Sequence, residues 1–198
     1  MIINEDLLLA NGATEESCNI NQILFHEGDR PLYYFQIVKG TIELNNYHED
    51  GKEFTQNILF DGQSFGESLL FNDSPYPMNA VVKAESTVLK LTKANFLKLI
   101  KENSEISLNV FKCLSDRLLY KYIMLFSLSS TNPVFKLETV MNYLKSYSSN
   151  QSQFSFKIPL TRQQLANLTG LRVETVIRVI KRMEEMLILR VESGKIYY

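Results

Sequence analysis

The stretch LTRQQLANLTGLRVETVIRVIKR, residues 160–182, decides how this chain is interpreted. Its first part predicts a short helix, because Thr161 can cap the helix and Gln164, three residues later, can bond back to the N–H of the cap. Gly170 supplies the positive backbone dihedral that ends the helix. The apolar face of this helix consists of Leu165 and Leu168.

A second helix follows, and its two faces differ in chemistry. The side chains expected to be buried recur at i, i+3, i+4 and i+7: Val173, Val176, Ile177 and Ile180. The other face is polar and mostly basic: Arg172, Glu174, Thr175, Arg178, Lys181 and Arg182. Two short helices, a glycine turn and a second helix with a basic face describe a helix-turn-helix.

The segments TRQQLA, TGL and ETVIRVIKRMEE resemble the DNA-binding motif of the CRP/FNR family of transcription regulators. In that family a Glu and an Arg four residues apart on the second helix read base edges, and the matching positions are Glu174 and Arg178. Residues four apart share a helix face, Arg can bind guanine O6 and N7, and Glu can accept from cytosine. The alternative is a solvated ion pair. Val173 and Ile177 each differ from one branch of the family, so the DNA sequence of the half-site cannot be inferred from either branch.

Further side chains around the motif are expected to contact the DNA backbone. After the second helix, LILRVE, the Ser193-Gly194 turn and KIYY predict a β-hairpin wing, from which Lys195 or Arg190 could reach a phosphate. The expected backbone contacts are Thr161, Arg162, Arg172, Thr175, Lys181, Arg182 and Lys195.

Charge is distributed unevenly along the 198 residues. The whole chain carries −1, but residues 133–198 hold ten Lys and Arg against five Asp and Glu, a balance of +5. The basic charge therefore gathers where the helix-turn-helix lies, as phosphate binding requires. No apolar run approaches the roughly 20 residues that span a membrane, and the N-terminus does not look like a secretory signal, so a cytoplasmic location is expected.

Residues 23–91 differ in composition from the rest of the chain, because short runs of strand-forming residues alternate with glycines. This pattern favours an antiparallel sandwich or barrel, with turns at HEGD, VKG and EDGK. FHEGDRPLYYFQIVKGTIEL (25–44) resembles the opening of the double-stranded β-roll of cyclic-nucleotide-binding domains, and FGESLLF (65–71) resembles its phosphate-binding cassette. Residues 1–20 are expected to form a helical or irregular lead-in.

The resemblance breaks at the expected ligand contacts. Gly66 and Glu67 match the cassette, but Met78 stands where the family's phosphate-binding Arg would be, and a buried phosphate needs a paired charge. The family's base-contacting Thr-Ser pair falls at Lys121-Tyr122. Cyclic AMP is therefore not expected to bind in the usual way, and Glu67 either contacts another ligand or satisfies turn N–H groups. The effector-pocket positions are Gly66, Glu67, Ser68, Met78, Asn79, Lys121 and Tyr122.

A long helix is predicted from Ser104 to Ser127, followed by a hinge at 128–132 and another helix that Asn132-Pro133 begins. One row has coiled-coil spacing and is expected to form a dimer interface: Leu108, Phe111, Ser115, Leu118, Tyr122 and Leu125. A second stripe is expected to cover the β-roll: Ile106, Val110, Cys113, Tyr120 and Met124. The alternative is one wide buried face in a monomer.

The remaining candidates for chemistry are few. The two cysteines, Cys18 and Cys113, are too few to bind an iron–sulfur cluster through four thiolates. They are either a redox switch or two thiols without a chemical role. His26 and His48 lack the spacing of a metal site. No metal, cofactor or enzymatic nucleophile–base pair is therefore predicted.

The resulting prediction is an α+β chain with four parts. Residues 1–103 form a jelly-roll-like β-roll effector domain, 104–127 a dimerisation helix, 128–132 a hinge and 133–198 a winged helix-turn-helix. The resemblance implies a homodimeric regulator of pseudo-palindromic double-stranded DNA, with RNA polymerase and an unknown small-molecule effector as further partners. The rivals are a cyclic-nucleotide-responsive regulator with a rearranged pocket, a ligand-binding protein whose helix-turn-helix contacts proteins, and an enzyme on the β-barrel.

Overall fold

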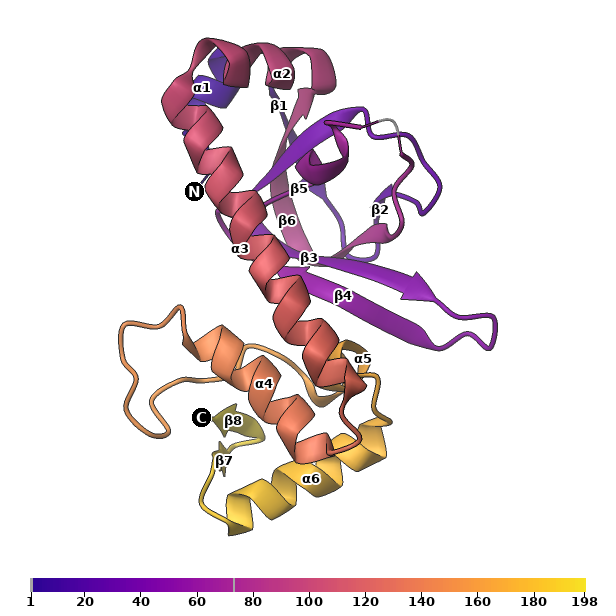
Figure 1. Cartoon of the computed structure of the whole chain (residues 1–198), viewed down its shortest axis with the longest axis vertical. Coiled ribbons are helices and arrows are strands. Elements are labelled where there is room, and N and C mark those ends of the chain that lie inside the picture. The colour runs from indigo at the N-terminus through magenta and orange to yellow at the C-terminus, as the bar shows by residue number, and fades with distance from the viewer. Residues whose placement is uncertain (1, 73) are drawn as a thin grey trace. The chain divides into compact units, whose positions relative to one another are not determined.

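The computed structural model describes residues 2–72 and 74–198 (Figure 1). The chain divides into two compact units, Met1–Asp116 and Arg117–Tyr198, and the division falls within one helix, α3 (Ser104–Ser129). No helix of the described part is both long and apolar enough to cross a membrane.

The first unit is an antiparallel β-roll with short helices. Its sheet runs in the order β1-β6-β3-β4, while β2 pairs with β6 and β5 pairs with β3. The elements are α1 (Glu5–Ala10), β1 (Thr14–Cys18), β2 (Ile23–Phe25), β3 (Tyr33–Tyr47), β4 (Glu53–Leu59), β5 (Ser64–Phe65), the 3-10 helix η1 (Glu67–Leu69), β6 (Asn79–Thr92) and α2 (Lys93–Glu102). The first part of α3 completes the unit.

Strand β3 continues through Gly40, where the sequence predicted a turn, so that prediction was wrong. The pairing of β3 with β6 shifts register between Ile37 and Ile42, and Gly40 adopts a φ of 121° there. A Cβ at Gly40 would lie only 2.0 Å from the Ser86 hydroxyl oxygen, and that oxygen accepts a hydrogen bond from the Thr41 N–H at 3.1 Å. Glycine thus allows one long strand to bend where a bulkier residue would end it.

Residues 1–20 were expected to be helical or irregular, but Thr14–Cys18 forms strand β1. Thr14–Cys18 pairs with β6 in register, Thr14 opposite Lys90 and Cys18 opposite Ser86. Of its five side chains only that of Cys18 is buried, so the segment lacks the apolar alternation that marks a strand in sequence. Lys90 reaches Glu16 at 3.7 Å across this edge.

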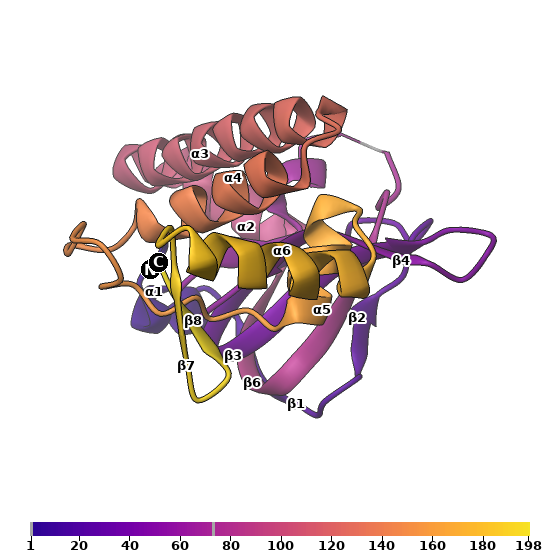
Figure 2. The same cartoon turned by 90° about the horizontal axis from the view of Figure 1, so that it is seen from below.

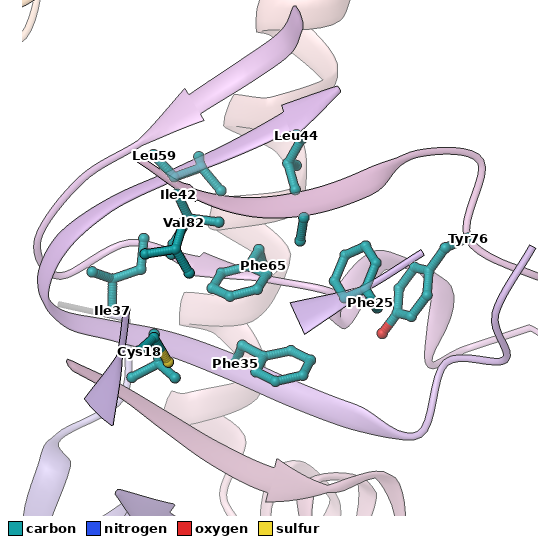
Figure 3. Close-up of a cluster of buried hydrophobic side chains, with 12 residues drawn as sticks. Cys18, Phe25, Phe35, Ile37, Ile42, Leu44, Leu59, Phe65, Tyr76 and Val82 are labelled. Atoms are coloured by element: carbon teal, nitrogen blue, oxygen red, sulfur yellow. The ribbon is translucent and has the colours of Figure 1, made fainter. Parts of the chain in front are cut away.

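Two apolar clusters form the core of the first unit. The cluster inside the roll (Figure 3) is Cys18, Phe25, Phe35, Ile37, Ile42, Leu44, Leu59, Phe65, Tyr76, Ala80, Val82 and Val88. The other cluster joins the sheet to α1, α2 and α3, and it includes Ile106 and Val110 from α3. Two members of the stripe expected to cover the roll therefore do so.

The second unit holds the rest of α3, then α4 (Pro133–Lys145), α5 (Arg162–Thr169), α6 (Val173–Glu185) and the hairpin β7 (Arg190–Glu192) and β8 (Lys195–Tyr197). Helix α3 ends two residues later than expected, at Ser129. Asn132 caps α4, since its side-chain oxygen accepts from the Val134 N–H at 3.0 Å. Figure 2 shows α4 lying beside α6, and α4 contacts both α5 and α6. Between α4 and α5, an isolated β-bridge joins Lys157 to Tyr197.

Candidate nucleic-acid interface

Helix α5 begins and ends as its sequence predicts. The Thr161 side chain accepts from the Gln164 N–H at 3.1 Å, and the Gln164 side chain accepts from the Thr161 N–H at 2.9 Å. Gly170 ends the helix with a φ of 68° and a ψ of 10°, the left-handed conformation that glycine adopts without cost. Leu165 and Leu168 are buried. These local contacts fix the turn that aims α6.

The buried face of α6 differs from the prediction at Ile177. The buried side chains are Val176, Val179, Ile180 and Met183. Ile177 was expected among them, but it is 50% exposed, and Val173 is only half-buried. Each helical residue turns by about 100°, so Ile177 lies beyond the edge of the arc that Val176, Val179 and Ile180 define. The true apolar stripe begins three residues later than expected.

The exposed face of α6 brings Glu174, Ile177, Arg178 and Lys181 together. Glu174, Arg178 and Lys181 are exposed, and their spacing of four and seven residues places them on one side of the helix. Ile177 lies between Glu174 and Lys181 on the same face, so it adds an apolar surface to a polar row. A row of this kind can combine hydrogen bonds to base edges with contact to a thymine methyl group.

The residues expected at the DNA backbone surround this face. Lys181 and Arg182 are exposed on α6, Arg172 is exposed at its N-cap, and Thr175 is half-buried. Thr161 is already used as the cap of α5. Arg162 donates from Nη1 to the Gly194 main-chain oxygen at 2.8 Å, which ties the start of α5 to the tip of the wing.

The wing is a hairpin, as predicted, with a two-residue turn in which Ser193 and Gly194 have φ values of 48° and 76°. Lys195 is exposed beside this turn. Arg190 instead pairs with Glu192 at 3.1 Å and lies over the Phe154 ring at 4.9 Å. Lys195 is therefore the better phosphate contact of the two.

Lys145 is a buried cation that the sequence did not reveal. It is 8% exposed and donates to the main-chain oxygens of Ser152 and Tyr198 at 2.8 and 2.9 Å. Its ammonium also lies 5.4 Å from the centre of the Tyr198 ring. These bonds hold the loop after α4 against the strand that completes the wing. A basic residue at a helix end usually indicates only favourable charge near the carbonyls, so no local signal distinguishes this role.

The row expected at a dimer interface is exposed along α3. Leu108, Phe111, Leu118, Tyr122 and Leu125 are between 52% and 69% exposed. Ser115 is exposed as well. The second stripe lies on the covered side, where Ile106, Val110, Tyr120 and Met124 are buried and Cys113 is half-buried. The helix therefore has one covered face and one exposed apolar face. Tyr120 and Met124, which were expected to cover the β-roll, belong to the second unit, where the Tyr120 ring lies 4.7 Å from that of Tyr143.

Most of the expected effector positions lie in the roll. Gly66 has a φ of 84° and precedes η1, and Glu67 is 1% exposed. Met78 packs against the cluster inside the roll, whereas Ser68 is exposed. The Asn79 side chain accepts from the Glu27 N–H at 3.0 Å, so it has a structural role.

The remaining candidates for chemistry are Lys121, Tyr122, the two cysteines and the two histidines. Lys121 and Tyr122 belong to the second unit, where both are exposed on α3. Cys18 is buried and Cys113 half-buried, neither of them in a disulfide bond, and burial raises the pKa of the Cys18 thiol. His26 and His48 are exposed. Within residues 2–72 and 74–198 no group of three or more His, Cys, Asp or Glu side chains could hold a metal ion.

A buried carboxylate inside the sheet was also missed by the sequence. Glu43 is 1% exposed and pairs with the Lys83 ammonium at 3.3 Å, and that ammonium also reaches Glu53 at 3.2 Å. Burial, with the nearby Glu53, raises the pKa of Glu43. Lys83 is shared between the two acids, so the cluster places one cation between two carboxylates.

Known proteins resemble both parts of the chain. A family model described as "Cyclic nucleotide-binding domain" matches residues 15–103, and one described as "Crp-like helix-turn-helix domain" matches residues 138–197. The "cAMP-activated global transcriptional regulator CRP" of Haemophilus influenzae is 27% identical over 165 residues, 82% of this chain and 73% of its own length. The "cAMP-activated global transcriptional regulator Vfr" of Pseudomonas aeruginosa is 29% identical over 177 residues, 86% of this chain and 82% of its own.

Solved structures agree with this fold. FixK2 from Bradyrhizobium japonicum superposes with a TM-score of 0.79 at 18% identity, covering 93% of this chain and 91% of its own. A CooA mutant from Carboxydothermus hydrogenoformans gives 0.81 at 19% identity, covering 98% and 87%. With a β-roll, a capped helix-turn-helix and a wing in place, this chain belongs to the CRP/FNR family and is a DNA-binding transcription regulator rather than an enzyme.

Proposed function

We propose that the protein acts as a homodimer on a pseudo-palindromic DNA site, with one α6 in each of two successive major grooves. The open apolar row of α3 supports the dimer, because aliphatic and aromatic side chains that are more than half exposed along several helical turns favour a partner helix. A second copy of this chain would supply the same row and complete a coiled-coil seam. The effector domain is then 1–103, the dimer helix and hinge follow, and 133–198 binds DNA.

The exposed face of α6 is the observation that carries the proposal. Glu174 and Arg178 read base edges, Glu174 by accepting from cytosine and Arg178 by binding guanine. Ile177 adds an apolar contact to a thymine methyl group. The surrounding cations, with Lys195 on the wing, hold phosphates and fix the position of the helix in the groove.

Signal input enters at the β-roll, and we infer that cyclic AMP does not act there as it does in the named relatives. Met78 cannot pair with a cyclic phosphate, and it packs into the apolar cluster. An input at the roll would bias the DNA-binding units between two arrangements. RNA polymerase is the further partner that family membership suggests.

The test is selection of bound duplexes from a random DNA pool, with and without cyclic AMP. A palindromic consensus that is the same in both arms supports the proposal. A consensus that appears only with cyclic AMP favours the rival, a cyclic-nucleotide-responsive regulator with a rearranged pocket. No consensus in either arm favours a helix-turn-helix that contacts proteins.

Arg178→Ala tests the base-reading assignment on the selected site. We expect a loss of about 1–3 kcal/mol on that site and a relaxed preference at one base pair. Lys195→Ala is the matched control, since loss of a phosphate contact weakens binding on all sequences alike. If Arg178→Ala also weakens all sequences equally, Arg178 contacts only phosphate.

A further inference from the structure

Tyr76 lies inside the β-roll although it comes from the loop between η1 and β6. Its side chain is 3% exposed and stacks on Phe25, with ring centres 3.7 Å apart and planes inclined by 10° (Figure 3). Phe25 in turn faces Phe35 and Phe65 at 6.0 and 6.1 Å. A loop side chain thus forms the outermost layer of an aromatic stack that fills the roll.

The hydroxyl end of Tyr76 reaches the turn that begins η1. A Cβ added at Gly66 would lie 3.1 Å from the Tyr76 hydroxyl oxygen, tighter than an ordinary contact, and Gly66 has a φ of 84° that favours glycine. Burial and then the negative charge of Glu67 raise the pKa of Tyr76. The hydroxyl end of Tyr76 therefore lies close to Gly66, one of the two positions at which the sequence matches the phosphate-binding cassette.

The main chain around Tyr76 is held on both sides. The Tyr76 N–H donates to the Asp29 main-chain oxygen at 2.9 Å, and the Gly28 N–H donates to the Tyr76 oxygen at 2.8 Å. Pro75 and Pro77 flank the residue and restrict the backbone. These constraints reduce the entropy lost when the ring is placed.

The space left beside the ring is small. The hollow beside it has a volume of about 250 Å³ and is lined by Leu24, Phe25, Asp29, Arg30, Leu32, Tyr33, Phe35 and Tyr76. Small-molecule sites usually measure about 300–1,000 Å³. The hollow beside the Tyr76 ring is therefore smaller than a usual small-molecule site.

We propose that Tyr76 is a built-in ligand of the β-roll, a phenol ring that the chain itself supplies at the effector position. This inference rests on the proposed function only in treating the roll as the effector domain of a regulator. The Tyr76 ring thereby completes the apolar cluster inside the roll without a diffusible nucleotide. Truncating Tyr76 to alanine creates a vacant site for a free phenol of the same shape, 4-methylphenol.

The experiment is thermal unfolding of the full chain and of Tyr76→Ala, each with and without millimolar 4-methylphenol or cyclic AMP. Loss of the ring should lower the melting temperature by roughly 10 °C, as for other large-to-small changes in a core. 4-Methylphenol should restore several degrees to the variant only, since a vacant apolar cavity binds small aromatics and binding stabilises the folded state. Cyclic AMP should leave the wild-type melting temperature unchanged.

Two controls keep the outcome decisive. Tyr76→Phe should melt at or above the wild-type temperature, because the Tyr76 hydroxyl has no hydrogen-bond partner among the described residues. It should not respond to 4-methylphenol, because its ring still fills the site. An unchanged melting temperature in Tyr76→Ala, or no response of that variant to 4-methylphenol, would overturn the proposal, as would a wild-type chain stabilised by cyclic AMP.

A measurement on the folded wild-type ring covers the case in which Tyr76→Ala does not fold. Fluorine NMR of the chain labelled with 3-fluorotyrosine gives one signal for Tyr76, identified by its absence in Tyr76→Phe. That signal should titrate at higher pH than those of exposed tyrosines, and titration together with them would refute the buried position. None of these readouts uses DNA, so failure of DNA binding would count against the proposed function alone.

Discussion

The role of Ile177 can be tested by removing its side chain and the thymine methyl group one at a time. Ile177 is 50% exposed, so half of its apolar surface remains to be buried in a complex. Full burial of an isoleucine side chain contributes about 1.5–3 kcal/mol, so the remaining half corresponds to about 1 kcal/mol, and one methyl group contributes about 0.8 kcal/mol. The coupling between side chain and methyl group should therefore be about 0.5–1 kcal/mol, or two- to fivefold in Kd.

The assay is fluorescence-anisotropy titration of the selected duplex, with each thymine of a half-site replaced in turn by deoxyuridine, which lacks the methyl group. Wild type should lose affinity at one thymine, and Ile177→Ala should be insensitive at that position. Met186→Ala is the matched control, because Met186 is similarly exposed, 56%, but lies at the C-terminal end of α6. Equal losses for wild type and Ile177→Ala at every thymine would refute the contact.

Three further changes probe the fold and the dimer. Thr161→Ala removes the cap of α5 and should cost about 1 kcal/mol in urea unfolding, and an unchanged midpoint would contradict the importance of the capping box. Tyr122→Glu should convert dimers to monomers in sedimentation, whereas Lys112→Glu, also exposed on α3, should not; dimers in both would argue for a different interface. Folding raises the pKa of Glu43 above its unfolded value of 4.5, so the ionised carboxylate destabilises the folded chain at a pH above the folded pKa. This destabilisation disappears as the pH falls toward 4.5. Glu43→Gln should thus melt above wild type at pH 8, with the gap closing on acidification, and a less stable variant at pH 8 would show that the Lys83 pairing outweighs burial.

The features predicted correctly from sequence are those that local chemistry decides. The Thr161 cap, the Gly170 turn and the Asn132 cap each depend on residues within a few positions of one another. The exposed row of α3 follows from helical periodicity alone. These elements define the helix-turn-helix, which is why the family could be recognised from a short stretch.

The features missed depend on partners far away in the chain. Strand β1 forms because β6 offers it an edge, not because its own sequence alternates. The exposure of Ile177 is decided by which arc of α6 meets the rest of its unit. Nothing near Tyr76 indicates that its ring enters the roll, since its stacking partner Phe25 lies 51 positions earlier.

The crowding at Gly40 affects how a mutational scan of this regulator should be interpreted. Every substitution there places a Cβ against Ser86, and it also imposes a φ of 121° that other residues avoid. By contrast, an added Cβ at Gly28, Gly51 or Gly194 meets nothing within 4 Å. Variants at Gly40 should lose activity because less folded protein accumulates, even though Gly40 belongs to strand β3 and not to the helix-turn-helix. A scan scored only by reporter output would place Gly40 among the signalling residues, and a parallel measurement of protein abundance would remove it from that set.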